Sequence, residues 1–161
     1  MNNLRVALYQ PEIPGNTGAV LRLGACLGLA IDVIEPTSFD ISDKNLKRAG
    51  MDYLEMAALR RHVDFSRFDA WRREEGRRLV LLSTKAAISY LDFAFRPNDV
   101  LMLGRESAGV PDEVHNLVDA RILIPMEPNA RSLNLSVSAA IVASEAKRQL
   151  MLQAQEFTTH G

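Results

Sequence analysis

The chain has 161 residues, of which 47% are hydrophobic and 24% are charged, and its formal net charge is −1. These values are typical of one soluble globular domain and exclude a protein that binds polyanions over its whole surface. No apolar run is long enough to span a membrane, and the first residues lack the apolar core of a secretory signal, so we expect a cytoplasmic protein. The single Cys26 excludes an intrachain disulfide and a thiolate metal cluster.

The first residues of the chain predict a βαβ unit. Leu4–Tyr9 is a short apolar run typical of a strand, and two prolines after it predict a loop. A helix capped by Asn16 or Thr17 follows, and Gly28 is placed to end it. Leu29–Ile34 then predicts the next strand, parallel to the first.

Basic residues stand out in two places. Arg22 lies inside a helix that is otherwise apolar and small, so it either reaches solvent or faces a site, and its planar fork suits a phosphate. A short helix after the second strand puts Lys44, Lys47 and Arg48 on one face at i, i+3 and i+4. That stripe is either a solvated face or a contact for an anionic partner.

The middle of the chain predicts two more strands and a helix. Met51–Leu59 contains a candidate short strand, and Phe65–Arg73 predicts a helix that packs its aromatic side chains inward. The charged run 72–78 predicts a solvated turn. Leu79–Leu82 predicts a buried strand, and residues 83–85 form a loop at its carboxyl end.

Two further apolar runs, Val100–Leu103 and Ile122–Ile124, predict buried strands. Each opens into an unusual loop: Gly104–Pro111 has two glycines, where a backbone can approach a ligand closely, and Pro125–Ser132 leads into a helix rich in small residues. If the two strands are adjacent and parallel, the loops leave the same sheet edge and form a ligand crevice.

The last helix shows an i, i+4 rhythm at Leu133, Val137 and Ile141. Beyond it the chain is polar and we expect it to fray. The sequence therefore predicts a single domain over residues 1–152 and a polar C-terminal tail over residues 153–161.

Several enzyme classes are excluded because the chain lacks their sequence motifs. The first strand–helix turn, P-E-I-P-G-N-T-G, is not the dinucleotide-binding G-x-G-x-x-G, and the chain has no P-loop G-K-[ST]. It also has no G-x-S-x-G elbow, and its three histidines lack metal-ligand spacing. A metal site is not predicted.

Three separated motifs do form a known set. They are Asn16-Thr17-Gly18 followed by Arg22, then L-x-L-G-x-E-x-x-G-V-P at Leu101–Pro111, then Ile124-Pro125-Met126 with Ser132-Leu133-Asn134-Leu135-Ser136. In this order, over nearly the whole chain, they resemble the 2′-O-methylating branch of the SPOUT superfamily of S-adenosylmethionine-dependent RNA methyltransferases. The absence of an added RNA-binding domain and the run Asp43–Tyr53 are similar to the tRNA (cytidine(34)-2′-O)-methyltransferase group. Arg105-Glu106 departs from the Pro-Glu of some wobble enzymes, so the resemblance supports the reaction more strongly than the target nucleotide.

The resemblance implies an α/β fold: a six-stranded parallel sheet flanked by helices, with a C-terminal trefoil knot. It implies S-adenosylmethionine as methyl donor without a metal, and a homodimer packed through the last helix. The loops at the sheet edge would hold the donor, and the donor-binding residues it implies are Leu82, Thr84, Gly104, Glu106, Gly109, Ile124, Met126, Ser132 and Leu133.

The resemblance also implies 2′-O-methylation of the wobble nucleotide of tRNA, C34 or U34 of leucine tRNAs, and neither DNA nor a membrane as partner. The implied catalytic residues are Arg22, Asn16, Ser132 and Asn134. Because guanidinium stays protonated, we interpret Arg22 as a phosphate and hydroxyl clamp and not as a base.

Other interpretations stay open at this stage. Glu106 is either a base with a raised pKa or a loop anchor, and the anchor is preferred. Candidate RNA contacts are Arg131 and the stripe Lys44, Lys47 and Arg48. A methyltransferase for another tRNA position or for rRNA, and a non-catalytic RNA-binding module of the same fold, are the alternatives.

Overall fold

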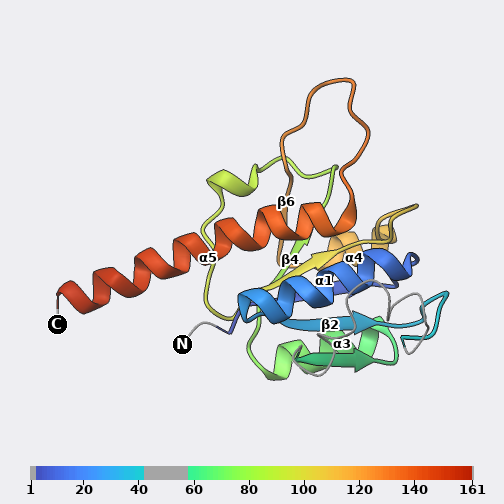
Figure 1. Cartoon of the computed structure of the whole chain (residues 1–161), viewed down its shortest axis with the longest axis horizontal. Coiled ribbons are helices and arrows are strands. Elements are labelled where there is room, and N and C mark those ends of the chain that lie inside the picture. Colours follow the sequence, from blue (N-terminus) through green and yellow to red (C-terminus); the bar gives the residue numbers. More distant parts are fainter. Residues whose placement is uncertain (1–2, 42–57, 161) are drawn as a thin grey trace.

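The computed structural model describes residues 3–41 and 58–160, and its centre is one six-stranded sheet (Figure 1). Every strand pair is parallel, and the order across the sheet is β3-β2-β1-β5-β4-β6. The strands are β1 Arg5–Tyr9, β2 Ala30–Ile34, β3 Leu59–His62, β4 Leu79–Leu82, β5 Val100–Leu103 and β6 Ala120–Ile122. The predicted α/β class and the six-stranded parallel sheet are confirmed.

Helices cover both faces of this sheet. They are α1 Pro14–Leu27, α3 Phe65–Glu74, α4 Asp112–Leu117 and α5 Leu135–Thr159, with a short 3₁₀ turn, η2, at Tyr90–Asp92. α1 and α5 lie side by side on one face, while α3 packs on the opposite face, behind the sheet in the view of Figure 1. None of the helices in the described ranges is long and apolar enough to cross a membrane.

The hydrophobic core has two parts, one on each face of the sheet, because successive side chains of a strand point to opposite faces. Val6 and Leu8 of β1 face α1 and α5, where they meet the small buried residues of α5. Ala7 and Tyr9 face α3 and α4 and pack with Phe68 and neighbouring aromatic rings. The aromatic face predicted for α3 is confirmed, because Phe68 is fully buried and Phe65 and Trp71 are partly buried against it.

The loops that matter for function leave the carboxyl ends of β4, β5 and β6 at one edge of the sheet. The strands β5 and β6 are parallel but not adjacent, because β4 lies between them. Strand order depends on pairings between distant segments, which local patterning does not encode. The last strand also begins earlier than predicted and ends at Ile122, after which Leu123 forms an isolated parallel bridge with Ser89 and Ile124 belongs to the loop.

The start of α1 differs from its prediction, and its end does not. α1 begins at Pro14 and not after Asn16, and Ile13 is its N-cap residue with no side-chain cap. Proline suits the first turn, because its missing N–H would have no partner there. Gly28 ends α1 as predicted, with φ 68°.

α5 is longer and buries a different face than predicted. It begins after Asn134 and continues to Thr159, so the polar residues from Gln153 onward are helical, and their expected fraying stays a prediction. Leu133 and Val137 are 40% and 46% exposed, whereas the small residues Ala139, Ala143 and Ala146 are buried. Small side chains let the helix lie close to α1 and the sheet. The division into a domain and a tail stays a prediction.

Charged residues are buried in two places where the sequence predicted none. Arg72, part of the run expected to be a solvated turn, is 2% exposed and binds the carboxylates of Asp69 and Asp119. Asp32 in β2 is fully buried between Arg5 and His62, at 2.7 and 2.8 Å. β3 spans Leu59–His62 and not the predicted Met51–Leu59, most of which lies outside the described residues.

Candidate functional site

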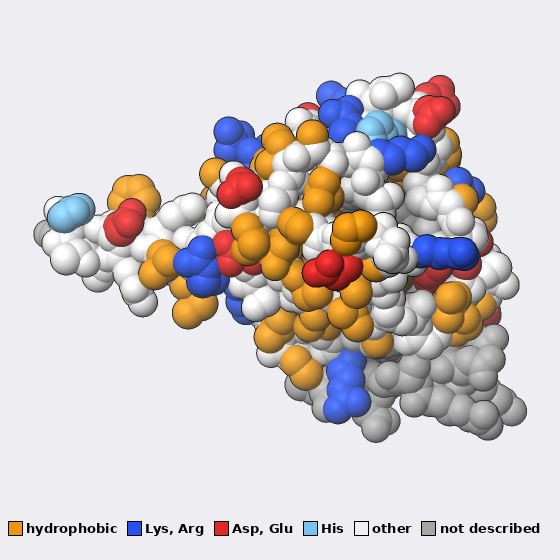
Figure 2. All heavy atoms as spheres, turned by 90° about the horizontal axis from the view of Figure 1, so that it is seen from above, with side chains coloured by type: hydrophobic (Ala, Val, Ile, Leu, Met, Phe, Trp, Pro, Cys, Tyr) orange, Lys and Arg blue, Asp and Glu red, His pale blue; other side chains and the backbone are white. Residues whose placement is uncertain are grey.

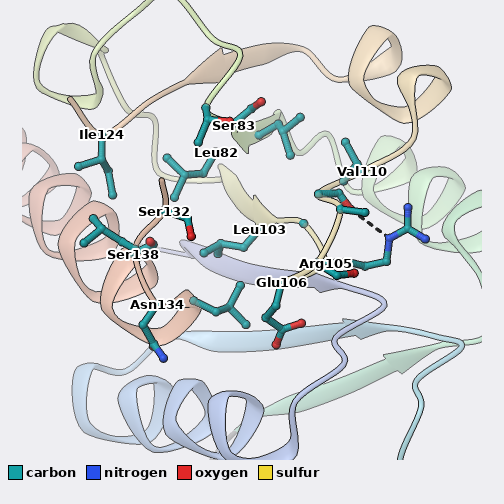
Figure 3. Close-up of a pocket in the computed structure, with 18 of the residues that line it drawn as sticks. Leu82, Ser83, Leu103, Arg105, Glu106, Val110, Ile124, Ser132, Asn134 and Ser138 are labelled. Carbon is teal, nitrogen blue, oxygen red and sulfur yellow. Dashed lines mark hydrogen bonds between the residues drawn. The ribbon is translucent and has the colours of Figure 1, made fainter. Parts of the chain in front are cut away.

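A cavity of about 530 Å³ opens where the three loops meet the start of α1 and of α5. Its floor is apolar: Leu82, Leu103 and Ile124 point into it from the ends of β4 and β5 and from the loop after β6 (Figure 3). Its rim is polar and includes Ser83, Thr84, Ser132 and Asn134. The volume lies within the range of ordinary small-molecule sites.

The loop after β5 is closed on itself. Arg105 and Gly109 exchange two backbone hydrogen bonds, of 3.0 and 2.9 Å, and Gly109 has φ 62°, which favours glycine. A Cβ on Gly104 would lie 2.7 Å from the Cα of Gly109. The glycine at 104 is therefore required by the loop itself, and the prediction that it also leaves space for a ligand stays a prediction. The Arg105 side chain points away from the cavity and donates to the Gly109 carbonyl at 3.1 Å.

Glu106 is held as a loop anchor. Its carboxylate accepts the backbone N–H of Glu12 at 3.0 Å and that of Ile13 at 3.4 Å, immediately before α1. An anion at a helix amino end is also favoured by the helix dipole. Both oxygens are thus engaged with backbone donors, which favours the anchor over a general base.

Asn134 fixes the orientation of Asn16. As N-cap of α5, the Asn134 side-chain carbonyl accepts the N–H groups of Ser136 and Val137. Its amide nitrogen must then point the other way, and it donates to the Asn16 side-chain carbonyl at 3.0 Å. Asn16 consequently presents its own NH₂ group, a pure donor, at the rim of the cavity.

The structure brings most of the predicted site residues together. Those that line the cavity are Asn16, Leu82, Thr84, Gly104, Glu106, Gly109, Ile124, Met126, Arg131, Ser132, Leu133 and Asn134. Arg22 is exposed on α1 and is not among the lining residues. Lys44, Lys47 and Arg48 lie outside the described residues. The roles assigned to all of these side chains stay predictions.

The lining residues that the sequence analysis missed as site residues include His115 on α4, Ser138 on α5 and Ile13 before α1. Ile13 stands directly before the Asn16 motif, which was a usable signal. His115 lies one helical turn after Pro111, but nothing in the local pattern says that α4 faces the loop after β4. In the part of the chain described here, no group of three His, Cys, Asp or Glu side chains could hold a metal ion.

With this geometry established, comparison with known proteins decides the family. The model of the SpoU rRNA Methylase family matches residues 3–144. The chain belongs to this family. The resemblance read from the three motifs is therefore confirmed.

Individual relatives agree with the family. A Beijerinckia indica protein named tRNA (cytidine(34)-2′-O)-methyltransferase is 59% identical over 145 residues, which cover 90% of this chain and 91% of that protein. A solved structure from work on the 2-OH methylation of C/U34 on tRNA has a TM-score of 0.88 and 41% identity, over 93% of this chain and 97% of that one. An AdoMet-bound rRNA methyltransferase from Sinorhizobium meliloti has a TM-score of 0.84 and 28% identity, over 93% of this chain and 58% of that chain.

Proposed function

We propose that this protein transfers a methyl group from S-adenosylmethionine to the 2′-hydroxyl of nucleotide 34 of tRNA. The observation that carries the proposal is the cavity at the carboxyl edge of β4 and β5, closed by the loop from Gly104 to Gly109, in a chain of the SpoU family. The name of the Beijerinckia relative and the C/U34 structure support position 34.

The cavity suits the donor in shape and chemistry. Leu82, Leu103 and Ile124 offer apolar surface to an adenosine, and the closed glycine loop offers backbone groups where side chains are absent. The predicted donor-binding residues would hold it there. When bound, S-adenosylmethionine supplies an electrophilic methyl on a sulfonium. No metal is needed by this chemistry.

The polar rim suits the ribose. The Asn16 NH₂ group, fixed by Asn134, is placed to donate to a ribose or phosphate oxygen. Donors aimed at an oxygen that develops negative charge stabilise the transition state. Arg22 lies outside the cavity, so we assign it to the RNA, as a phosphate and hydroxyl clamp, and not to the donor. Arg131 lines the cavity and is exposed, which suits a phosphate contact.

The finer features rest on the family resemblance. We include in the proposal a trefoil knot formed by the C-terminal part of the chain, a cytoplasmic location and leucine tRNAs as substrates. We also include a homodimer through α5. An exposed stripe on this helix, Val137, Ser144 and Met151 at intervals of seven residues, supports the dimer because these residues lie on one face.

Methyl transfer to defined tRNA tests the proposal. The purified protein is incubated with radiolabelled S-adenosylmethionine and a leucine tRNA, and with the same tRNA carrying 2′-deoxycytidine at position 34. We expect label in the first and none in the second. Equal labelling of both tRNAs would show that the methyl group goes to another position. If rRNA, tested in parallel, were labelled and the tRNA were not, rRNA would be the substrate. Binding of tRNA without any transfer would support the non-catalytic alternative.

A further inference from the structure

Two glutamates from different loops each accept a backbone N–H of the other loop. The Glu106 carboxylate, after β5, accepts the Glu12 N–H at 3.0 Å. In return the Glu12 carboxylate, before α1, accepts the Ser107 N–H at 2.9 Å and the Ser107 hydroxyl at 2.7 Å. We call Glu12, Glu106 and Ser107 the loop clasp.

The loop clasp joins the two halves of the site that the proposed function separates. Glu106 and Ser107 belong to the loop that closes the donor side of the cavity, which Figure 3 shows with Glu106 directed toward the start of α1. Glu12 lies outside the cavity wall, but Ile13 and Asn16, on the next residues of the chain, line it. A shift of either loop is therefore transmitted to the other through these hydrogen bonds.

The geometry of both ends is fixed by the backbone. Gln10 has φ 45°, a conformation that non-glycine residues rarely adopt, and its N–H binds the Ile34 carbonyl at 2.9 Å. This turn directs Glu12 toward the β5 loop. At the other end, the backbone pairing of Arg105 with Gly109 holds Ser107 at the loop tip.

The bonds of the loop clasp are charged but exposed. The hydrogen bonds from the Ser107 backbone and hydroxyl lower the pKa of the Glu12 carboxyl, so the carboxylate form is the one that binds. Hydrogen bonds to an ionised acceptor are stronger than neutral ones. Because Ser107 is exposed, water can replace these bonds when the loop moves, so the contact can form and break.

We infer that Glu12 is a positioning residue that couples donor binding to tRNA binding. This inference rests on the proposed function. A donor that orders the Gly104–Gly109 loop also orders Ser107, and through Glu12 it orders the start of α1 and Asn16 on the RNA side. The coupling is reciprocal, so tRNA raises the affinity for donor by the same factor as donor raises the affinity for tRNA.

Calorimetry with S-adenosylhomocysteine, the unreactive product of the donor, measures this coupling. Its affinity is determined with and without saturating leucine tRNA for the wild-type protein and for Glu12→Ala and Glu12→Gln. For wild type we expect tRNA to tighten binding by about 5-fold or more, the lower end of measured couplings. In Glu12→Ala the factor should fall close to one, and in Glu12→Gln, whose amide oxygen is a weaker neutral acceptor, it should fall clearly below the wild-type value. In both variants the KM for tRNA should rise far more than kcat falls.

Three matched measurements isolate the effect. Ser107→Ala keeps the backbone donor and should retain part of the coupling. Glu113→Ala removes an exposed glutamate of α4 that has no hydrogen bond to either loop among those described, and should retain all of it. Glu12→Gln keeps the shape of the side chain, so it decides the question if circular dichroism shows Glu12→Ala to be misfolded.

The outcomes separate the two proposals. Wild-type protein that binds donor and methylates tRNA, with full coupling in Glu12→Gln, would overturn the role of the loop clasp alone. Wild-type protein with no coupling at all would do the same. A wild-type protein that neither binds S-adenosylhomocysteine nor methylates tRNA would overturn the proposed function, and the inference with it.

Discussion

At the scale of single residues, the loop after β5 depends on a glycine at position 104. A methyl group at this position would meet the backbone of Gly109 at 2.7 Å, so Gly104→Ala must open the loop. We expect a loss of about 1–3 kcal/mol in the free energy of unfolding, typical of overpacking. Affinity for S-adenosylhomocysteine should fall by at least about tenfold, which corresponds to 1.4 kcal/mol. Calorimetry and urea unfolding measure the two effects.

Gly15→Ala is the matched control for this substitution. A Cβ on Gly15 has no atom within 4 Å, and the residue lies in the first turn of α1. Alanine there should leave donor affinity unchanged and stabilise the protein by about 0.4–1 kcal/mol through the unfolded chain. If Gly104→Ala bound the donor with wild-type affinity, the closed loop would not be needed for donor binding.

Because of Glu145 in α5, we expect the stability of the protein to depend on pH in the acid range. The hydrogen bonds from Arg148, with a smaller contribution from Gln149, lower the pKa of the Glu145 carboxyl to about 2. Gln149 also binds the backbone of Phe93 and Phe95, so this carboxylate supports the contact between α5 and the segment before β5. A group whose pKa is lowered on folding stabilises the protein above its unfolded pKa and loses that effect as pH falls.

The stabilisation from Glu145 should therefore be complete at pH 6 and disappear as pH falls from about 4.5 toward about 2. Urea unfolding of wild type and Glu145→Gln across this range gives the measurement. The difference between the two proteins should shrink with acidity. A difference that stays constant down to pH 2 would show that the ionised carboxylate is not responsible.

Among the elements, the edge of the sheet from β1 to β3 depends on one buried carboxylate. Asp32 is fully buried and binds Arg5 through two hydrogen bonds, of 2.7 and 3.0 Å, and His62 at 2.8 Å. Asp32→Asn leaves the guanidinium without its counter-charge, and we expect it to lower the free energy of unfolding by about 3–5 kcal/mol. Urea unfolding measures this loss.

The control is Glu35→Gln, whose partner Arg61 is 51% exposed. Loss of an exposed pair should cost less than about 1 kcal/mol. Equal losses in the free energy of unfolding for the two variants would contradict the view that burial makes the Asp32 ion pair more important for stability than the exposed one.

α5 carries the proposed dimer interface, and its exposed stripe gives the test. In Figure 2 the helix projects from the body, with hydrophobic side chains along it, and Met151 is 59% exposed. Ser144→Glu with Met151→Glu places two like charges on the stripe without touching the core. Sedimentation should show twice the chain mass for wild type and a folded monomer for the variant.

Ala143→Glu would not test the interface, because Ala143 is fully buried within the protomer. Glu156→Lys is a better control, since this exposed residue lies about 120° around the helix from Ser144. It should remain dimeric. A wild-type protein that sediments as a monomer would refute the dimer.

Elements with a strong local pattern were predictable from sequence, and those set by distant contacts were not. β1, β2, β4 and β5 lie within one residue of the apolar runs that predicted them. The strand order and the buried face of α5 were missed, because they depend on which surfaces meet. Arg72 was assigned to solvent because local charge patterning cannot reveal that Asp119, 47 residues later, supplies its partner.

For the whole molecule, the three motifs predicted residues that the structure brings to one cavity. Asn16, Gly104–Gly109 and Ser132–Asn134 come from distant parts of the chain, and the parallel sheet brings them to one cavity. Glu12 could not be singled out, because its partner Ser107 is 95 residues away and neither residue looks unusual locally. The motif resemblance, and not periodicity, made position 34 of tRNA the predicted target.

The central claim, methylation of the 2′-oxygen of nucleotide 34, is tested most directly by mass spectrometry of tRNA fragments from cells with and without this gene. Anticodon-loop fragments of leucine tRNAs should carry a ribose methyl at nucleotide 34 in the presence of the gene. They should lack it in the deletion strain and regain it when the wild-type gene is restored. An unchanged methyl at nucleotide 34 in the deletion strain would contradict the account.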